Sequence, residues 1–99
     1  MTTSASETVI PLATSVAASD DSLSVELSDG RSISVPLAWF PRLLHGTVAE
    51  RENWTLIARG EGIHWPDLYE DISVSSLLAG GPSDEGPASL QRWLAGRKA

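Results

Sequence analysis

The fold is decided by Leu23–Leu37, which has the sequence LSVELSDGRSISVPL. Apolar and polar residues alternate on both sides of Ser28-Asp29-Gly30, a pattern that is typical of a β-hairpin. A two-residue Asp29-Gly30 loop would mix the two faces, whereas a three-residue loop keeps the apolar side chains together. We therefore predict a bulged turn with Gly30 in the left-handed conformation. The predicted cross-strand pairs are Leu27–Arg31, Glu26–Ser32, Val25–Ile33, Ser24–Ser34 and Leu23–Val35.

Weaker patterns flank this hairpin. On its N-terminal side, Leu12–Ala18 is a candidate strand. On its C-terminal side, Pro36 and Pro41 predict that the second strand ends near Val35 and that a short helix begins around Trp39, because proline has a fixed φ and no amide hydrogen. We expect Pro41 in the first turn of that helix.

The next part of the chain predicts a second hairpin between helical turns. Thr47–Glu50 has the form of a capping box and predicts a short helix over about 48–52. Trp54–Ala58 and Ile63–Trp65 read as two strands joined by a glycine-rich turn. Asp71–Val74 either extends the sheet or leads directly into a one-turn helix, and the pattern leaves both alternatives open.

A C-terminal helix is predicted from Gly86-Pro87 onward, with Leu90, Trp93 and Leu94 on one face. Together these elements predict an α+β domain: an antiparallel sheet of about four or five strands, built from hairpins and covered on one face by short helices. We assign residues 12–96 to this single domain. Residues 1–11, rich in Ser and Thr, are expected to form a flexible tail.

The composition excludes several kinds of protein. The 99 residues include 13 acids against 7 bases and no cysteine, for a net charge of −6. Without cysteine there is no disulfide framework, thiolate metal site or thiol nucleophile. The negative charge argues against direct binding of nucleic acid, which needs clustered Lys and Arg. No apolar run is long enough to cross a bilayer, so we expect a cytoplasmic protein that makes no membrane contact.

Much of the negative charge lies in one stretch. Residues 60–91 contain six acidic residues and neither Lys nor Arg. Such a run is either a solvated surface that keeps a small protein dispersed or a face that docks a basic partner. The acidic residues are Glu61, Asp67, Glu70, Asp71, Asp84 and Glu85.

The densest cluster of chemically capable residues is Gly62–Asp71. His64 and the carboxylates that follow it could in principle bind a metal or act as a general base. Pro66 argues against the helix that would bring residues three apart onto one face, so we expect neither a metal site nor catalysis. In an extended segment His64 and Trp65 point to opposite faces, and one of them is buried.

We predict a partner-binding site that combines acidic residues with tryptophans. Trp39 beside Phe40 and Trp65 beside Pro66 are candidates for partly exposed interface anchors. The predicted partner-binding residues are Trp39, Glu61, His64, Trp65, Asp67, Glu70 and Asp71.

About residues 12–80 closely resemble the bacterial domain-of-unknown-function family 2442. The resemblance is carried by Leu23–Leu37, Trp39–Leu43, Glu50-Arg51, Asn53-Trp54, Gly60–Pro66 and Glu70–Val74. It implies a small α+β domain with no established catalytic activity, often encoded beside a second small protein in pairs that look like toxin–antitoxin modules. The family commonly has aspartate where this chain has Tyr69, which weakens a cation-binding interpretation. Some relatives continue into a helix-turn-helix, but the single C-terminal helix predicted here carries over no DNA binding.

Three functional hypotheses follow. The first is a non-catalytic interaction module, antitoxin-like or regulatory, whose partner is a small basic protein such as a toxin encoded nearby. The alternative is an acidic, nucleic-acid-mimicking inhibitor of a defence complex, similar to an anti-CRISPR protein. The third is an enzyme that uses His64 and Asp67. We expect the first, with no enzyme activity and no cofactor; exposed strand edges also allow a homodimer.

Overall fold

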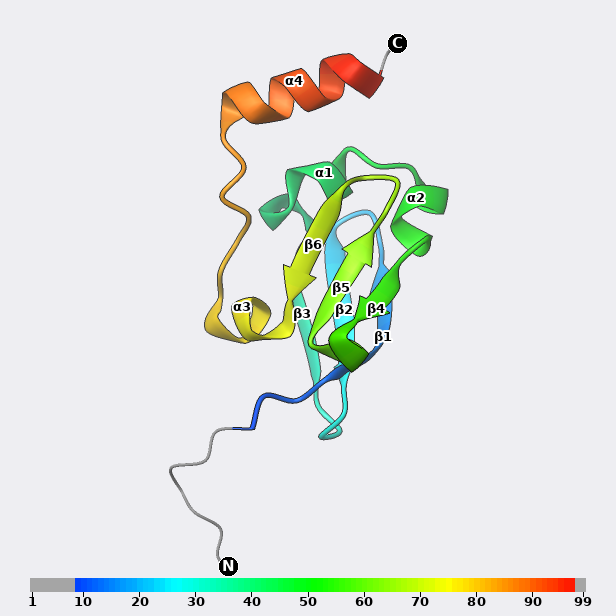
Figure 1. The fold of residues 1–99 in the computed structure, drawn as a ribbon, viewed down its shortest axis with the longest axis vertical. Helices are drawn as coiled ribbons and strands as arrows, with labels where there is room; N and C mark the ends of the chain where they lie inside the picture. Colours follow the sequence, from blue (N-terminus) through cyan, green and yellow to red (C-terminus); the bar gives the residue numbers. More distant parts are fainter. Residues whose placement is uncertain (1–8, 98–99) are drawn as a thin grey trace, which may run out of the picture.

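The computed structural model describes residues 9–97, so most of the tail predicted for residues 1–11 lies outside the described residues. Six strands form two antiparallel three-stranded sheets, seen one in front of the other in Figure 1. Sheet A has the order β1-β2-β3 and sheet B the order β4-β5-β6. The strands are β1 (Ala13–Ala18), β2 (Ser22–Leu27), β3 (Ser32–Pro36), β4 (Thr55–Ile57), β5 (Gly62–Trp65) and β6 (Glu70–Ser73).

Short helical segments connect the strands, and a longer helix follows them. The 3₁₀ segments are η1 (Leu37–Trp39) and η2 (Ala58–Gly60), and the α-helices are α1 (Pro41–Leu44), α2 (Val48–Glu52), α3 (Val74–Ala79) and α4 (Pro87–Arg97). No helix in the described part of the chain is long and apolar enough to span a membrane.

The first hairpin has the predicted register. Val25 lies opposite Ile33 and Leu23 opposite Val35, and the Leu27 amide donates to the Arg31 carbonyl oxygen at 2.8 Å. Gly30 has a φ of +92°, the conformation that the three-residue turn requires.

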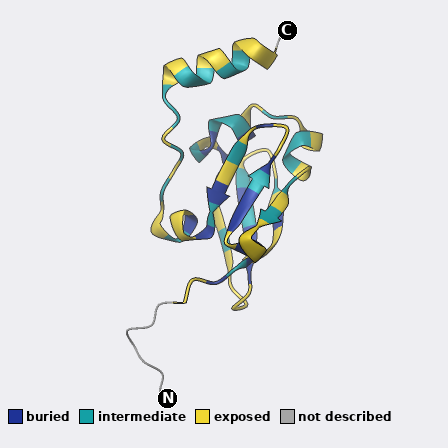
Figure 2. Cartoon of the chain, viewed as in Figure 1, coloured by how far each residue is buried: buried dark blue, intermediate teal, exposed yellow. Residues whose placement is uncertain are grey.

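The α+β class is confirmed, but six strands form two sheets where one sheet of about four or five was predicted. Residues 37–54 take up helical turns between β3 and β4, so β4 pairs with β5 and not with β3. The apolar faces of both sheets therefore meet in one core, dark blue in Figure 2. The buried core residues are Ala13, Val16, Leu23, Val25, Leu27, Val35, Leu37, Phe40, Leu43, Ile63, Trp65, Leu68, Ile72, Val74 and Leu77.

The helix starts follow the predicted local signals. Pro41 begins α1, and Thr47 and Glu50 form the predicted capping box of α2. Asp71–Val74 contains both of the structures that the pattern left open. β6 ends at Ser73, whose side chain accepts a hydrogen bond from the Ser76 amide and so caps α3.

The η2 turn joins sheet B to sheet A at Gly60. This glycine has a φ of +110°, and a Cβ at that position would lie 2.5 Å from the Ala13 carbonyl oxygen. No other residue type fits there without moving β1. The contact fixes the turn of the second hairpin against the first strand of the chain.

Helix α4 stands apart from the two sheets and is reached through residues 80–86, which we call the linker (Figure 1). The helix forms where it was predicted, and Leu90, Trp93 and Leu94 are half-buried on its inner face. No residue of α4 is buried. Only Trp93 reaches the margin of the core.

Candidate functional site

Trp65, predicted as an exposed interface anchor, is fully buried. Its place in β5, opposite Glu70 of β6, puts it on the inner face of sheet B, and its indole Nε1 donates to the Arg51 carbonyl oxygen at 3.0 Å. The prediction for Trp65 is therefore corrected: alternation along β5 sends His64 outward and Trp65 into the core. The expectation that one of these two neighbours is buried is confirmed.

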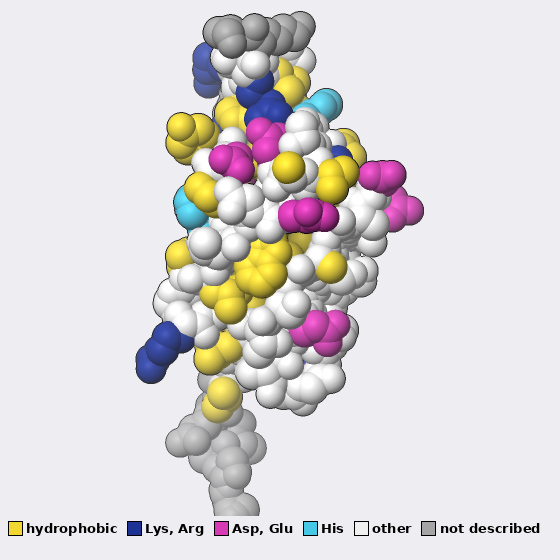
Figure 3. All heavy atoms as spheres, turned by 90° about the vertical axis from the view of Figure 1, so that its right-hand side faces the viewer, with side chains coloured by type: hydrophobic (Ala, Val, Ile, Leu, Met, Phe, Trp, Pro, Cys, Tyr) yellow, Lys and Arg dark blue, Asp and Glu magenta, His cyan; other side chains and the backbone are white. Residues whose placement is uncertain are grey.

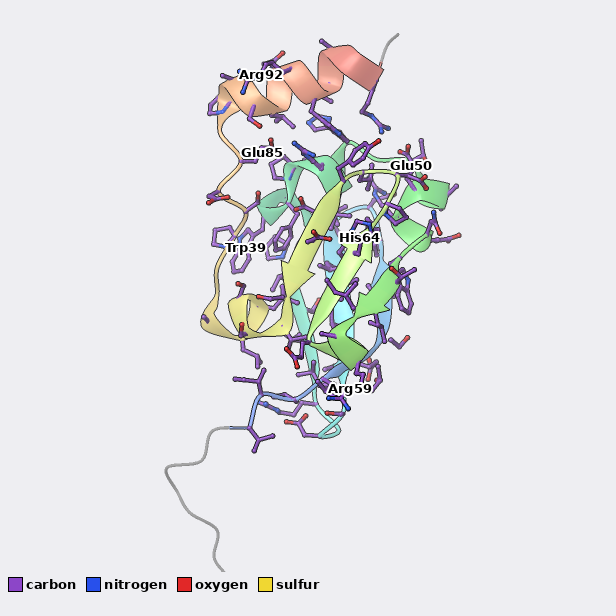
Figure 4. All side chains as sticks on the ribbon, in the orientation of Figure 1. Trp39, Glu50, Arg59, His64, Glu85 and Arg92 are labelled. Atoms are coloured by element: carbon purple, nitrogen blue, oxygen red, sulfur yellow. The ribbon has the colours of Figure 1, made fainter. Side chains whose placement is uncertain are left out.

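Trp39 is half-buried and packs against the core. Its carbonyl oxygen accepts a hydrogen bond of 2.9 Å from the Ser83 amide, which ties the linker to η1. Figure 4 shows its indole between the sheets and the linker. Trp39 therefore supports the linker, and only part of its ring faces solvent.

The predicted acidic residues do not form one surface. Glu61 and Asp67 lie at opposite ends of β5, separated by about 13 Å of extended strand. Asp67 is held by the Asn53 side-chain amide, which donates to it at 2.9 Å. Glu61 and Asp67 are thus distant from each other, and only Glu70 and Asp71 adjoin the same groove.

His64 and Asp71 form a cross-strand pair on the outer face of sheet B. The His64 Nδ1 lies within hydrogen-bond distance of the Asp71 carboxylate, and Thr55 of β4 faces His64 from the other side. The Asp71 side chain is 67% exposed, so the pair is open to water. Among the described residues no group of three His, Cys, Asp or Glu side chains could hold a metal ion. The pair is a polar cross-strand contact that links β5 to β6.

A groove lies between β6 and the linker, and we call it the β6 groove. It is lined by Phe40, Glu70, Asp71, Ile72, Ser73, Ser76, Gly81, Pro82, Ser83 and Asp84. The groove adjoins a second hollow, which shares Glu70, Ser83 and Asp84 with it and is further lined by Arg42, Tyr69, Glu85, Gly86 and Ser89.

Glu70 is a half-buried carboxyl that lines both the groove and this second hollow. Burial raises its pKa to about 7, an effect that Arg42 opposes and that the charges of Glu85, Asp71 and Asp84 reinforce. A carboxyl of this kind gives up its proton readily when a cation enters the groove.

Arg42 neutralises another acid beside the groove. Its guanidinium makes a bidentate pair with Glu85, with N···O distances of 2.6 and 3.1 Å. The Ser89 hydroxyl also donates to Glu85, and these hydrogen bonds hold the pKa of the Glu85 carboxyl below its ordinary value. Arg42 further donates to the Tyr69 carbonyl oxygen at 3.2 Å. Glu85 is thus paired with Arg42 and Asp71 with His64, whereas among the described residues Glu70 and Asp84 form no salt bridge.

Helix α4 is held by the indole of Trp93 and two arginines. The Arg42 and Arg97 guanidinium carbons lie 5.1 and 4.7 Å from the ring centroid. Arg97 also pairs with Glu50, with N···O distances of 2.7 and 3.1 Å. We call Arg42, Trp93, Arg97 and Glu50 the α4 clamp.

Sequence reasoning missed the opposite wall of the groove. Asp84 belongs to the acidic stretch but was left out of the predicted site, and Arg42 carried no visible signal because its partner Glu85 is 43 residues away. The sequence did contain one relevant signal. Asp84 closely follows Gly81-Pro82, a dipeptide that indicates a solvent-exposed turn or loop. The acidic side chains on the face in Figure 3 are scattered and form no continuous field.

Comparison with known proteins establishes the family and the fold. The model of the family described as Protein of unknown function (DUF2442) matches residues 13–83, and the chain belongs to this family. A crystal structure of a protein of unknown function from Rhodospirillum rubrum ATCC 11170, at 2.75 Å resolution, is similar, with a TM-score of 0.64 and 23% sequence identity. The similarity covers 81% of this chain and 96% of that chain. No curated protein matches the chain.

Proposed function

We propose that this chain is a non-catalytic protein-interaction module, antitoxin-like or regulatory, which binds a small basic protein in the β6 groove. The observation that carries the proposal is the meeting of Glu70, Asp71 and Asp84 at one groove. Among the described residues, none of these three carboxylates forms a salt bridge with Lys or Arg. The partner we propose is a small protein encoded nearby, and the setting is the cytoplasm.

The half-buried Glu70 predicts how such binding depends on pH. A lysine or arginine placed beside it favours its ionised form and lowers its pKa from about 7. Below about pH 7 complex formation then releases a proton, so the affinity rises as the pH increases toward about 7 and levels off above it.

The separation of the acidic residues favours this function over the nucleic-acid-mimicking inhibitor. Mimicry of a phosphate backbone requires regularly spaced carboxylates along one face. Here Glu61 and Asp67 lie at opposite ends of β5, and Glu85 is already paired with Arg42. A local groove suits one basic segment better than a charged duplex.

The test is a matched pair of charge reversals. Asp71→Lys with Asp84→Lys changes the charge at the groove, and Glu61→Lys with Asp67→Lys changes it equally elsewhere. Affinity for the product of the neighbouring gene is measured by titration calorimetry. We expect about tenfold or greater loss for the groove variant and little change for its control. Equal losses in the two variants, or no binding by the unaltered chain, would overturn the proposal.

A further inference from the structure

We propose that the partner's basic segment binds as an added β-strand along the free edge of β6, an inference that rests on the proposed function. Within residues 9–97, β6 pairs only with β5 and so forms an edge of sheet B. One wall of the β6 groove is this edge, and the opposite wall is the linker. The hollow between them has a volume of about 310 Å³.

The backbone register shows which groups face that edge. Gly62 lies opposite Ser73, which places Val74 opposite Glu61, and the Val74 amide donates to the Glu61 carbonyl oxygen at 2.9 Å. Hydrogen-bonded and non-bonded pairs alternate along an antiparallel ladder. The backbone N–H and C=O groups of Ile72 and Glu70 therefore point toward β5, and the backbone groups of Asp71 and Ser73 point away from it.

The linker leaves this edge open. Its backbone amides bond elsewhere: Gly80 to the Leu77 carbonyl oxygen, Gly81 to that of Ser76 and Ser83 to that of Trp39. No backbone hydrogen bond between the linker and β6 occurs among the described residues. The Asp71 amide, the Asp71 carbonyl and the Ser73 amide are consequently available to an extended chain.

The side chains at this edge identify the occupant by its charge. Glu70 and Asp84 line the groove itself, and Asp71 projects from the outer face beside His64. Residues of an added strand alternate between these two sides, and opposite charges across neighbouring strands stabilise each other. Two acids face the groove and one faces outward, so the matching segment carries lysine or arginine at the alternate positions that point into the groove beside Glu70 and Asp84, with small or apolar residues between them.

The probe is a synthetic peptide of alternating lysine and threonine, added to the isotopically labelled full chain. Amide hydrogen exchange is followed by NMR. We expect about tenfold or greater protection of the Asp71 and Ser73 amides. The control is Ser34, whose amide points out from the edge of β3 because Leu27 bonds to Arg31 and the ladder alternates from there. Its exchange should not change.

Two N-methylated peptides test backbone pairing without altering the protein. In one peptide every lysine carries a methyl group on its backbone nitrogen, and in the other every threonine does. The two patterns block opposite edges of the added strand. We expect one pattern to weaken binding by about tenfold and the other to have little effect, because only one peptide edge faces β6.

Three results would overturn strand addition. They are equal binding of both methylated peptides, no binding of the unmethylated peptide, and concentration-dependent protection of Asp71 and Ser73 without peptide, which would assign the edge to a second copy of this chain. If the neighbouring protein still binds and depends on Asp71 and Asp84, the proposed function stands while strand addition fails. If the groove variant and its control lose the same affinity for the neighbouring protein, the proposed function fails as well.

Discussion

The two sheets and helix α4 are stabilised by different forces. The sheets enclose a core of fully buried apolar side chains contributed by both, whereas α4 buries no residue and is attached through the α4 clamp. Apolar burial is additive and insensitive to direction. Ion pairs and cation–π contacts depend on geometry, salt and pH. We therefore expect α4 to separate under conditions that leave the sheets folded.

The largest effect tests the force that holds the sheets. Leu23 is completely buried in β2, so Leu23→Ala should lower the free energy of unfolding by about 2–5 kcal/mol through lost burial and a residual cavity. Leu94→Ala makes the same chemical change at a half-buried position of α4. It should lower the free energy of unfolding by less than about 1 kcal/mol. Urea unfolding of both variants measures the difference, and equal costs would contradict it.

The next effect concerns Glu70, at the margin between sheet B and the linker. Its pKa is about 7 in the folded chain, above the ordinary value of 4.5. The folded state therefore binds more protons between these values, and stability falls as the pH rises through this window. Glu70→Gln should remove that fall and raise stability by about 1 kcal/mol at about pH 8, with almost no effect near pH 4.

Thermal unfolding across this pH range measures the effect of Glu70. Glu61→Gln serves as the matched control because it makes the same chemical change at an exposed position outside the groove. A Glu70→Gln profile that still falls between pH 4.5 and 7 would assign the titration to another group.

The attachment of α4 should depend on Trp93. Trp93→Ala removes the ring that both guanidiniums contact, so the α4 amides should exchange about tenfold faster or more while those of β2 keep their protection. Hydrogen exchange resolved by residue gives this measurement. Equal acceleration in β2 would show that α4 and the sheets unfold together.

The smallest effect is loosening of α4 in acid. Hydrogen bonds from Arg97 and the Thr47 amide lower the pKa of Glu50 to about 2. The stabilisation is present above the ordinary pKa of 4.5 and is lost as the pH falls toward 2. Glu50→Gln should give faster α4 exchange at neutral pH and remove this acid dependence. Unchanged exchange in the variant would rule out a contribution from the ion pair.

Local chemistry made much of the fold predictable. The turn at Ser28–Gly30 fixed one register, and the capping box at Thr47 fixed one helix, because both signals act over a few residues. The division into two sheets could not be predicted, since it depends on which distant edges remain unpaired. The site was predicted only in part: alternation implied that His64 or Trp65 is buried but did not say which.

Long-range pairing explains why the walls of the groove were missed. Arg42 and Glu85 meet across the fold, and Asp84 faces β6 only because the Ser83 amide is bonded to the Trp39 carbonyl oxygen. No periodicity connects such positions. Composition identified the acidic third of the chain. It could not distinguish Glu85, which Arg42 neutralises, from Glu70 and Asp84, which form no salt bridge among the described residues.

Gly60 limits how this scaffold can be redesigned. Beside the Ala13 carbonyl oxygen there is no room for a methyl group at position 60, so the connection between β4 and β5 is a poor place to insert foreign sequence. At Gly30 a Cβ would have no other atom within 4 Å. A reporter or affinity tag grafted there would sit on a hairpin tip and leave the junction of the two sheets intact.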